Sequence, residues 1–344
     1  MAHNSGDDRY SVTIVDIDDP AAANAGSELF DFHAVQLQSR PFKIRRIIVR
    51  LDTATVVYHS TNVPVRTRTR LHAGLLAYVT YGPQAVGAVN GLPVRPGLLL
   101  SVPSGTDHLL VTGEDFESIA FLLPSDDVRA HLMVRGRGAE FHVPERIEPL
   151  QVDPAKVDEL FEWGKRLVSA ALLRPTMFDD ASRERTAARE DLFEIVLSTV
   201  SVADGFESTR ADRTRVSYGH VVRLAEDYAM AQGSERLYIT DLCRITGVSE
   251  RTLEYAFKEV MGLAPMAYLA RLRLHRVRQA LLAATNGPTT VAAAAVEWGF
   301  WHFGEFSRAY KECFGELPSE TLRRRDDQPP DREPASEPRQ PPCC

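Results

Sequence analysis

An internal repeat between residues 237 and 318 restricts the fold of this chain more than any other feature. The stretches "ITDLCRITGVSERTLEYAFKEVMGLAP" and "VAAAAVEWGFWHFGEFSRAYKECFGELP" carry the same succession of apolar stripe, glycine and proline. Matched residues recur 53 positions apart: Phe257 and Tyr310, Gly262 and Gly315, Pro265 and Pro318. A repeat of this kind indicates two copies of one supersecondary unit.

Each copy has the signals of two short helices joined by a tight turn. Gly247 and Gly299 stand at the turns, where a residue that tolerates positive φ is needed. Ser249 follows the first turn at the N-cap position, where its hydroxyl can accept from a free amide of the next helix. Cys243 and Ala295 are small enough for the two helices to cross closely. The sequence therefore predicts two helix-turn-helix units, a motif whose second helix enters the major groove of DNA.

The two units are joined by a stretch with the pattern of a single amphipathic helix. The segment "MAYLARLRLHRVRQALLAA" would be about 30 Å long as a helix, at about 1.5 Å per residue. Successive major-groove faces on one side of B-DNA are about 34 Å apart. One chain could therefore hold two recognition helices in adjacent grooves of one duplex.

The distribution of charge agrees with a DNA-binding region attached to a different kind of domain. The whole chain of 344 residues has a net charge of −7. Residues 234–325, in contrast, contain 13 basic and 10 acidic side chains. A basic module on an acidic chain is typical of a DNA-binding head joined to a partner domain.

The N-terminal half has the pattern of a β domain followed by two helices. Between residues 41 and 123, short β-branched and apolar runs alternate with turn residues, which predicts a sandwich or a small barrel. Asn90 and Gly91 form a hairpin signal. Asp153 and Pro154 begin an amphipathic helix, and a second helix is expected from about 183 to 202; core packing is favoured for both over a dimer interface.

The expected fold class is α+β multidomain, with an N-terminal cupin-like β-barrel, two trailing helices and a C-terminal all-α domain with two helix-turn-helix units joined by a long helix. The expected division is a flexible arm (1–30), a sensor domain (31–150), a helical packing or dimerisation segment (151–203), a linker (204–216), a DNA-binding domain (217–325) and a disordered tail (326–344). The first helix after the linker is expected to begin near Ser217. The tail ends in Cys343 and Cys344, whose role the sequence leaves open.

Residues 217–325 resemble the C-terminal DNA-binding domain of the AraC/XylS family of bacterial transcriptional regulators. The resemblance lies in "GVSERTL…F…GLAP…YL…RL…A…LL", followed by "A…GF…FSRAYK…FG…P", and covers about a third of the chain. It implies that the outer faces of both recognition helices read bases. The base-reading candidates are Arg251, Glu254, Tyr255, Phe303, Glu305 and Arg308.

Some of these side chains suit particular contacts with DNA. Arg251 can bind guanine through two hydrogen bonds, and Glu254 can accept from the amine of cytosine. Glu254 and Glu305 are equally compatible with a solvated helix surface, and Trp301 with Phe303 could contact thymine methyls or pack internally. Residues expected to contact phosphates, which position a protein without reading sequence, are Ser249, Lys258, Arg271, Arg273 and Lys311.

The β domain resembles the cupin-like sensor domain that precedes the DNA-binding unit in many AraC-type regulators. The spacing of the second cupin motif, G-x5-P-x-G-x2-H, is present at Gly97, Pro103, Gly105 and His108. A cupin metal site also needs an H-x-H element with a following glutamate, and His59 and His72 stand without one. We therefore expect no metal, no cofactor and no enzymatic activity.

The resemblance implies either an effector pocket in this domain or a purely oligomeric role. Candidate pocket residues are Tyr58, Tyr78, Tyr81 and His108, although aromatic side chains buried in a core would give the same pattern. A barrel interior of this composition could host an apolar or mixed ligand.

The leading hypothesis is a sequence-specific transcriptional regulator, and specifically an activator that responds to a small-molecule effector. Its expected partners are double-stranded promoter DNA and RNA polymerase, and it would bind DNA either as a monomer or as a dimer with a second copy of the chain. One alternative is a metal-dependent cupin enzyme fused to a DNA-targeting module; another is a metal-free ligand-binding protein whose helix-turn-helix units contact only proteins. No stretch has the length of a membrane helix and the first residues lack an export signal, so a cytoplasmic location is expected.

Overall fold

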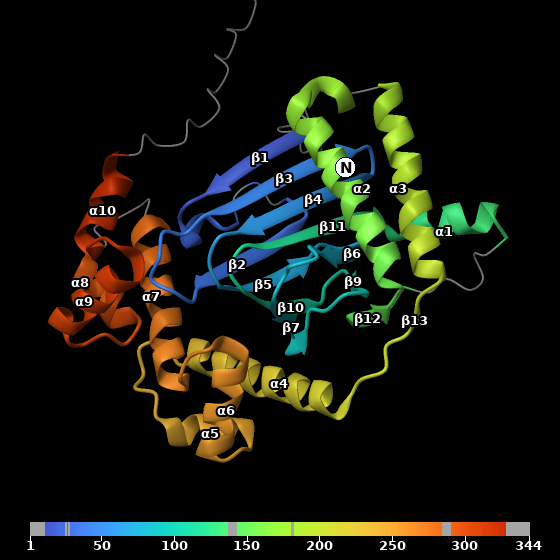
Figure 1. The fold of residues 1–344 in the computed structure, drawn as a ribbon. Coiled ribbons are helices and arrows are strands. Elements are labelled where there is room, and N and C mark those ends of the chain that lie inside the picture. The colour runs from blue at the N-terminus through green and yellow to red at the C-terminus, as the bar shows by residue number, and fades with distance from the viewer. Residues whose placement is uncertain are drawn as a thin grey trace, which may run out of the picture.

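The computed structural model describes residues 11–24, 26, 28–136, 143–179, 182–283 and 290–327. A β-rich half is followed by a helical half (Figure 1), which confirms the α+β multidomain class. Most of the expected tail, including Cys343 and Cys344, lies outside the described residues. Among the described helices, none combines the length and the apolar character needed to cross a membrane.

Two antiparallel sheets make up the β half, and among the described residues they face each other without closing into one barrel. The larger sheet has the order β1 (Val12–Ile17), β3 (Ile44–Leu51), β4 (Ala54–Thr61), β11 (Phe116–Pro124), β6 (Leu75–Tyr81), β9 (Leu98–Pro103), β12 (Glu148–Gln151) and β13 (Asp204–Gly205). The smaller sheet has the order β2 (Phe30–Gln36), β5 (Val65–Leu71), β10 (Asp107–Thr112), β7 (Gly87–Val89) and β8 (Leu92–Pro93). The predicted hairpin at Asn90 and Gly91 is confirmed, because both residues have positive φ and join β7 to β8.

The larger sheet is buried on both faces. Val57 on β4 points between the two sheets, whereas its neighbours Val56 and Tyr58 point to the opposite face, as the period of two in a strand requires. That opposite face is covered by α2 (Pro154–Leu173) and α3 (Arg183–Ser201) (Figure 1). Both helices therefore pack on the β domain, as the sequence predicted.

The short helix α1 (Ser125–Val134) connects this sheet to the following segment. The predicted start of α2 is confirmed. The Asp153 side chain accepts from the amide of Ala155, and Pro154 occupies the first turn. Two single turns, η1 (Pro20–Ala22) and η3 (Pro175–Phe178), complete this half of the molecule.

Seven helices form the C-terminal half of the described chain. They are α4 (Arg210–Ala231), α5 (Ile239–Thr246), α6 (Glu250–Met261), α7 (Pro265–Ala283), α8 (Val291–Glu297), α9 (Phe303–Phe314) and α10 (Pro318–Asp327). The first repeat packs α4, α5 and α6 around Leu253 and Phe257, and the second packs α8 and α9 around Phe306 and Tyr310. Helix α7 contributes to both cores and joins them, as predicted.

Two expectations about the connecting segments are wrong. Residues 12–17, placed in a flexible arm, form β1 and pair along their whole length with β3. Helix α4 begins at Arg210, seven residues before the expected start at Ser217, because Thr209 and Asp212 form a capping box that satisfies the first amides. The expected linker also contributes β13 to the larger sheet.

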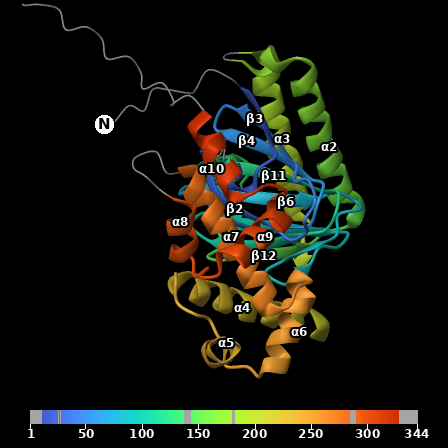
Figure 2. The same ribbon diagram turned by 90° about the vertical axis from the view of Figure 1, so that its left-hand side faces the viewer.

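The helical half is docked against the outer face of the smaller sheet (Figure 2). Leu109 on β10 and Val35 on β2 lie in the same core as Val222 and Ala225 of α4. The domains approach so closely that a Cβ at Gly219, in the middle of α4, would lie 2.5 Å from the Asn90 carbonyl oxygen. A layered arrangement results, in which the smaller sheet lies between the β core and the C-terminal helices.

Candidate nucleic-acid interface

The first candidate reading surface is the outer face of α6. Gly247 ends α5 with a φ of 69°, and the Ser249 hydroxyl accepts from the amide of Thr252 at 3.2 Å, so both predicted turn signals are confirmed. Leu253 and Phe257 face the core, which leaves the base-reading candidates Arg251, Glu254 and Tyr255 exposed. Amphipathic spacing thus turns the polar side of this helix to solvent.

Two of these exposed side chains support each other. Arg251 donates to the Tyr255 hydroxyl at 3.3 Å, and its guanidinium lies 5.4 Å from the centre of the Tyr255 ring. Together with Glu254 and Lys258 they line a shallow surface groove. The face therefore offers donors, an acceptor and an aromatic edge for hydrogen bonds to base edges.

The second candidate reading surface is the outer face of α9. Glu305 and Arg308 are exposed on this helix, while Phe306 and Tyr310 are buried beneath it. Trp301 is 59% exposed and Phe303 is 47% exposed at the start of the helix. Of the two alternatives for this aromatic pair, internal packing is wrong, because large parts of both rings lie in solvent.

The five phosphate candidates fall into three groups. Ser249, Lys258 and Lys311 are exposed beside the reading faces. Arg271 is partly buried and donates to the Gln36 carbonyl oxygen and to the Ser39 hydroxyl of the β domain. It is therefore engaged in domain docking.

Arg273 does not lie where a phosphate could reach it. Its side chain is buried and donates to the Glu235 carbonyl oxygen at 2.8 Å. Gly299 approaches the Arg273 guanidinium closely, and its φ of 79° is a left-handed conformation that favours glycine. Arg273 thus joins the connection between α4 and α5 to the turn of the second repeat, and its prediction as a phosphate contact is wrong.

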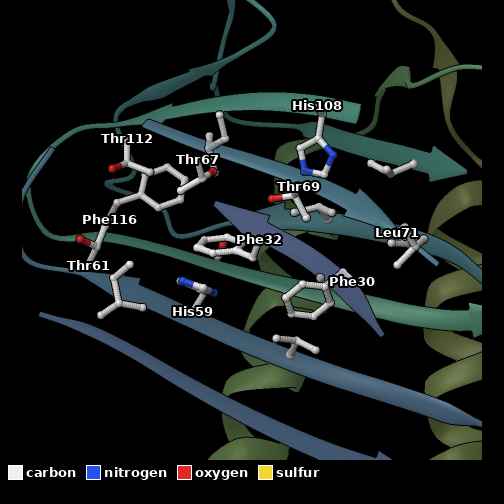
Figure 3. A pocket seen from close by; sticks show the side chains of 18 of the residues that line it. Phe30, Phe32, His59, Thr61, Thr67, Thr69, Leu71, His108, Thr112 and Phe116 are labelled. Carbon is white, nitrogen blue, oxygen red and sulfur yellow. The ribbon is translucent and has the colours of Figure 1, made fainter. Parts of the chain in front are cut away.

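A cavity of about 100 Å³ lies between the two sheets of the β domain. Figure 3 shows Phe30, Phe32 and Phe116 around it, together with several threonine side chains and the imidazoles of His59 and His108. Strands from both sheets contribute, so the wall is built by residues far apart in the sequence. Among the described residues, no three His, Cys, Asp or Glu side chains are grouped to hold a metal ion.

Only one of the four predicted pocket residues lines this cavity. His108 does, whereas Tyr58 and Tyr78 point to the other face of the larger sheet and belong to the core beneath α2 and α3. Tyr81 is buried against Phe116, with ring centres 5.9 Å apart, and does not line the cavity. The prediction for these three tyrosines is wrong, because Tyr58 and Tyr78 point to the covered outer face of the larger sheet and Tyr81 packs against Phe116 beside the cavity.

Both histidines in the cavity wall are held in the neutral form. Burial lowers the pKa of His108 to about 4, although the charge of Asp107 acts in the opposite direction. Burial, reinforced by the charge of Arg46, lowers the pKa of His59 well below its ordinary value. A neutral imidazole can donate one hydrogen bond and accept another.

A buried network of charged side chains joins the domains. Glu226 on α4 accepts from Arg66 of β5 and from the Tyr268 hydroxyl of α7. Arg68, two residues along β5, contacts Asp227 at 2.7 Å. This network was not predicted from the sequence, although the alternation of arginine and threonine in "VRTRTRL" indicates a strand with one charged face.

A second contact between the two halves of the molecule lies near the C-terminal end of α7. Arg278 forms two hydrogen bonds of 2.8 Å with Asp19, whose carboxylate also contacts Arg324 of α10. Burial opposes the ionisation of Asp19, but Arg278 more than offsets it, so the pKa of Asp19 lies below its ordinary value. The segment expected to be a flexible arm is thereby anchored to the C-terminal domain.

Comparison with known proteins places the similarity in the helical half. A helix-turn-helix domain family matches residues 242–324. The chain is 40% identical over 103 residues to the probable thc operon regulatory protein of Rhodococcus erythropolis, which is 30% of this chain and 31% of that protein. It is 32% identical over 109 residues to XylDLEGF operon transcriptional activator 3 of Pseudomonas putida, 32% of each chain.

A solved structure is also similar to part of this chain. It is that of a probable AraC family transcriptional regulator from Rhodopseudomonas palustris CGA009, 40% identical, covering 31% of this chain and 97% of that one with a TM-score of 0.29. The chain spans about a third of the length of the curated relatives that it matches. The family match over residues 242–324 includes both recognition helices, α6 and α9.

Proposed function

We propose that the protein is a sequence-specific transcriptional regulator with a C-terminal DNA-binding domain of the AraC/XylS type, which the helix-turn-helix family match and the similarity to two operon regulators support. Its target is double-stranded promoter DNA. The relatives that share this domain are a probable operon regulatory protein and an operon transcriptional activator, which supports activation as the outcome. The proposed role of the chain is regulation and not catalysis.

The observation that carries this proposal is the exposure of both recognition faces in one chain. Arg251, Glu254 and Tyr255 on α6 and Glu305 and Arg308 on α9 are all free of the core and of the docked β domain. The helix between the two units, α7, has 19 residues, which corresponds to about 28 Å at about 1.5 Å per residue. This length is close to the groove spacing of B-DNA of about 34 Å.

We propose that some residues at these faces contact base edges and that others contact phosphates. Arg251, Glu254, Tyr255, Phe303, Glu305 and Arg308 would read base edges. Ser249, Lys258 and Lys311 would contact phosphates. Trp301 joins the second reading face, where an exposed indole can pack against thymine methyl groups.

The β domain is proposed to be the sensor of the regulator. Its cavity between the two sheets supports a small-molecule effector rather than a purely oligomeric role. RNA polymerase and a second copy of the chain are the further partners proposed for an activator of this type. A cytoplasmic location is proposed on the ground that promoter DNA is the target.

The proposal is tested by selecting bound sequences from a random duplex pool with the full-length protein. A defined consensus is expected, with binding at ~150 mM salt that exceeds the binding of a scrambled duplex by on the order of 10³-fold or more. Affinity for the consensus should also fall steeply as salt rises. If no duplex is enriched and binding shows no steep salt dependence, the units would serve protein contacts instead.

A further inference from the structure

The cavity between the two sheets has a chemistry that restricts what it can hold. We propose that it binds a small uncharged molecule, mainly apolar, that carries one or two hydrogen-bonding groups. This inference rests on the proposed function, because such a molecule would be the effector to which the regulator responds. The contacts, charge and size of the cavity each support it.

Three buried polar atoms in the cavity wall lack a hydrogen-bond partner among the described residues: His59 Nε2, Thr67 Oγ1 and His108 Nδ1. Unpaired buried polar atoms are costly and therefore rare in native structures. Two other wall hydroxyls are already satisfied, since Thr61 bonds to the Val63 carbonyl oxygen and Thr112 to that of Val65. The unpaired atoms therefore mark where a bound molecule can exchange hydrogen bonds with the wall.

The cavity offers no counter-charge to an ionised ligand. None of the described side chains that line it is Asp, Glu, Lys or Arg, and both of its histidines are neutral near pH 7. Arg46 lies outside the lining, with its guanidinium over the rings of Phe30 and Phe32 and donating to the Ala23 carbonyl oxygen. Because an unpaired charge is very costly to bury, a carboxylate or an ammonium group is disfavoured.

The size of the cavity favours a ligand on the scale of a single ring. Its volume is about 100 Å³, and an engineered apolar cavity of about 150 Å³ binds benzene. Phe30, Phe32 and Phe116 supply an aromatic wall that favours an apolar body. A few ordered waters are the competing occupants, since they too could satisfy the unpaired atoms.

The experiment compares matched probes on the full-length protein. Benzyl alcohol and benzamide are the neutral polar probes, ethylbenzene lacks a polar group, and benzoate and benzylamine carry opposite charges at pH 7. Isothermal titration and the rise in Tm report binding. We expect binding by a neutral polar probe, weaker binding by ethylbenzene and no binding by the two charged probes at the same concentration.

Two variants show whether the probes occupy this cavity. Thr67→Val removes one unpaired hydroxyl at nearly constant volume and should weaken binding of the neutral polar probe by about threefold to tenfold. Ethylbenzene binding should be unchanged in this variant. Ala120→Leu fills the cavity from β11 and should abolish binding of both probes. The matched control is Thr80→Val, which removes a buried hydroxyl outside the cavity.

The outcomes separate this inference from the proposed function. A charged probe that binds as tightly as its neutral counterpart, an absence of binding by every neutral probe, or unchanged affinities in Thr67→Val and Ala120→Leu would each overturn the inference. Duplex binding by the same preparation is measured in parallel. Loss of sequence-specific DNA binding would contradict the proposed function while leaving the probe measurements valid.

Discussion

Arg66 on β5 and Glu226 on α4 form a salt bridge between the two domains, with side chains that are 5% and 1% exposed. The Tyr268 hydroxyl of α7 donates to the other carboxylate oxygen of Glu226. The next residue of β5, Thr67, lines the cavity on the opposite face of the strand. One strand therefore borders both the candidate ligand site and the docked helical domain.

Replacing Glu226 with glutamine should destabilise the protein strongly. The change leaves the Arg66 guanidinium buried without a counter-charge, which typically costs about 3–5 kcal/mol. Urea unfolding of the full-length chain measures the loss of free energy. Asp227→Asn is the matched control, because the Arg68–Asp227 pair is partly exposed and should contribute at most about 1 kcal/mol. Equal effects of the two variants would contradict a buried docking contact.

Gly219→Ala should weaken the docking of the domains. Alanine would favour the isolated helix α4 by about 0.5–1 kcal/mol, but its Cβ would lie 2.5 Å from the Asn90 carbonyl oxygen. Hydrogen exchange should therefore become faster in α4 and in the β7–β8 hairpin. Gly304→Ala, where a Cβ meets nothing within 4 Å, should leave this exchange unchanged. Slower exchange in Gly219→Ala would show that the domains separate in solution.

Arg308→Ala should reduce affinity for the selected duplex by about 1–3 kcal/mol if this side chain reads a base. The measurement is a gel-shift titration with the consensus sequence and with single-base changes of it. The variant should also lose discrimination at one base position. Arg129→Ala on α1 is an exposed arginine in the other domain and serves as the control. Unchanged affinity in Arg308→Ala would remove this residue from the reading face.

Lys258→Ala and Lys311→Ala should each make DNA binding less dependent on salt. A lysine that contacts a phosphate contributes about 0.9 to the slope of log affinity against log salt concentration. Each variant should lower that slope by about this amount without changing the preferred sequence. Lys156→Ala on α2, an exposed lysine in the β half, is the matched control. A changed preference at constant slope would instead indicate base reading.

The stability of the protein should fall as the pH decreases from about 6.5 towards 4. Burial lowers the pKa of His108 to about 4, below its ordinary value of 6.5, so in this window the unfolded chain binds a proton that the folded chain does not. The stabilisation is present above pH 6.5 and is lost on acidification. His108→Gln should flatten the dependence by up to about 1.4 kcal/mol per pH unit, measured by urea unfolding at pH 7 and pH 5. Identical dependence in the variant and the parent would contradict this origin.

Local sequence signals predicted the helical half well. The φ of Gly247, the cap at Ser249 and the exposure of Arg251 and Arg308 all depend on residues within one or two turns. A glycine is needed at a left-handed turn, and a helix with apolar residues on one side exposes the other side. Such signals do not require knowledge of the rest of the fold.

The predictions that were wrong for individual side chains depended on longer-range contacts. Tyr58 was expected in the cavity, but both faces of its sheet are buried, so the hydrophobic pattern does not tell one face from the other. Arg273 looked like an exposed cation on an amphipathic helix, but it donates to the Glu235 carbonyl oxygen in the connection between α4 and α5. In both cases the deciding neighbour is distant in sequence.

The sequence by itself determined that this chain carries two helix-turn-helix units, where they turn and which faces they present, because these properties follow from short-range backbone and amphipathic preferences. Only the tertiary structure decided which residues line the cavity and that β5 separates it from the docked domain. The pairing of Arg66 with Glu226 joins residues 160 positions apart. Contacts of that separation depend on how complete layers pack, which the local pattern does not encode.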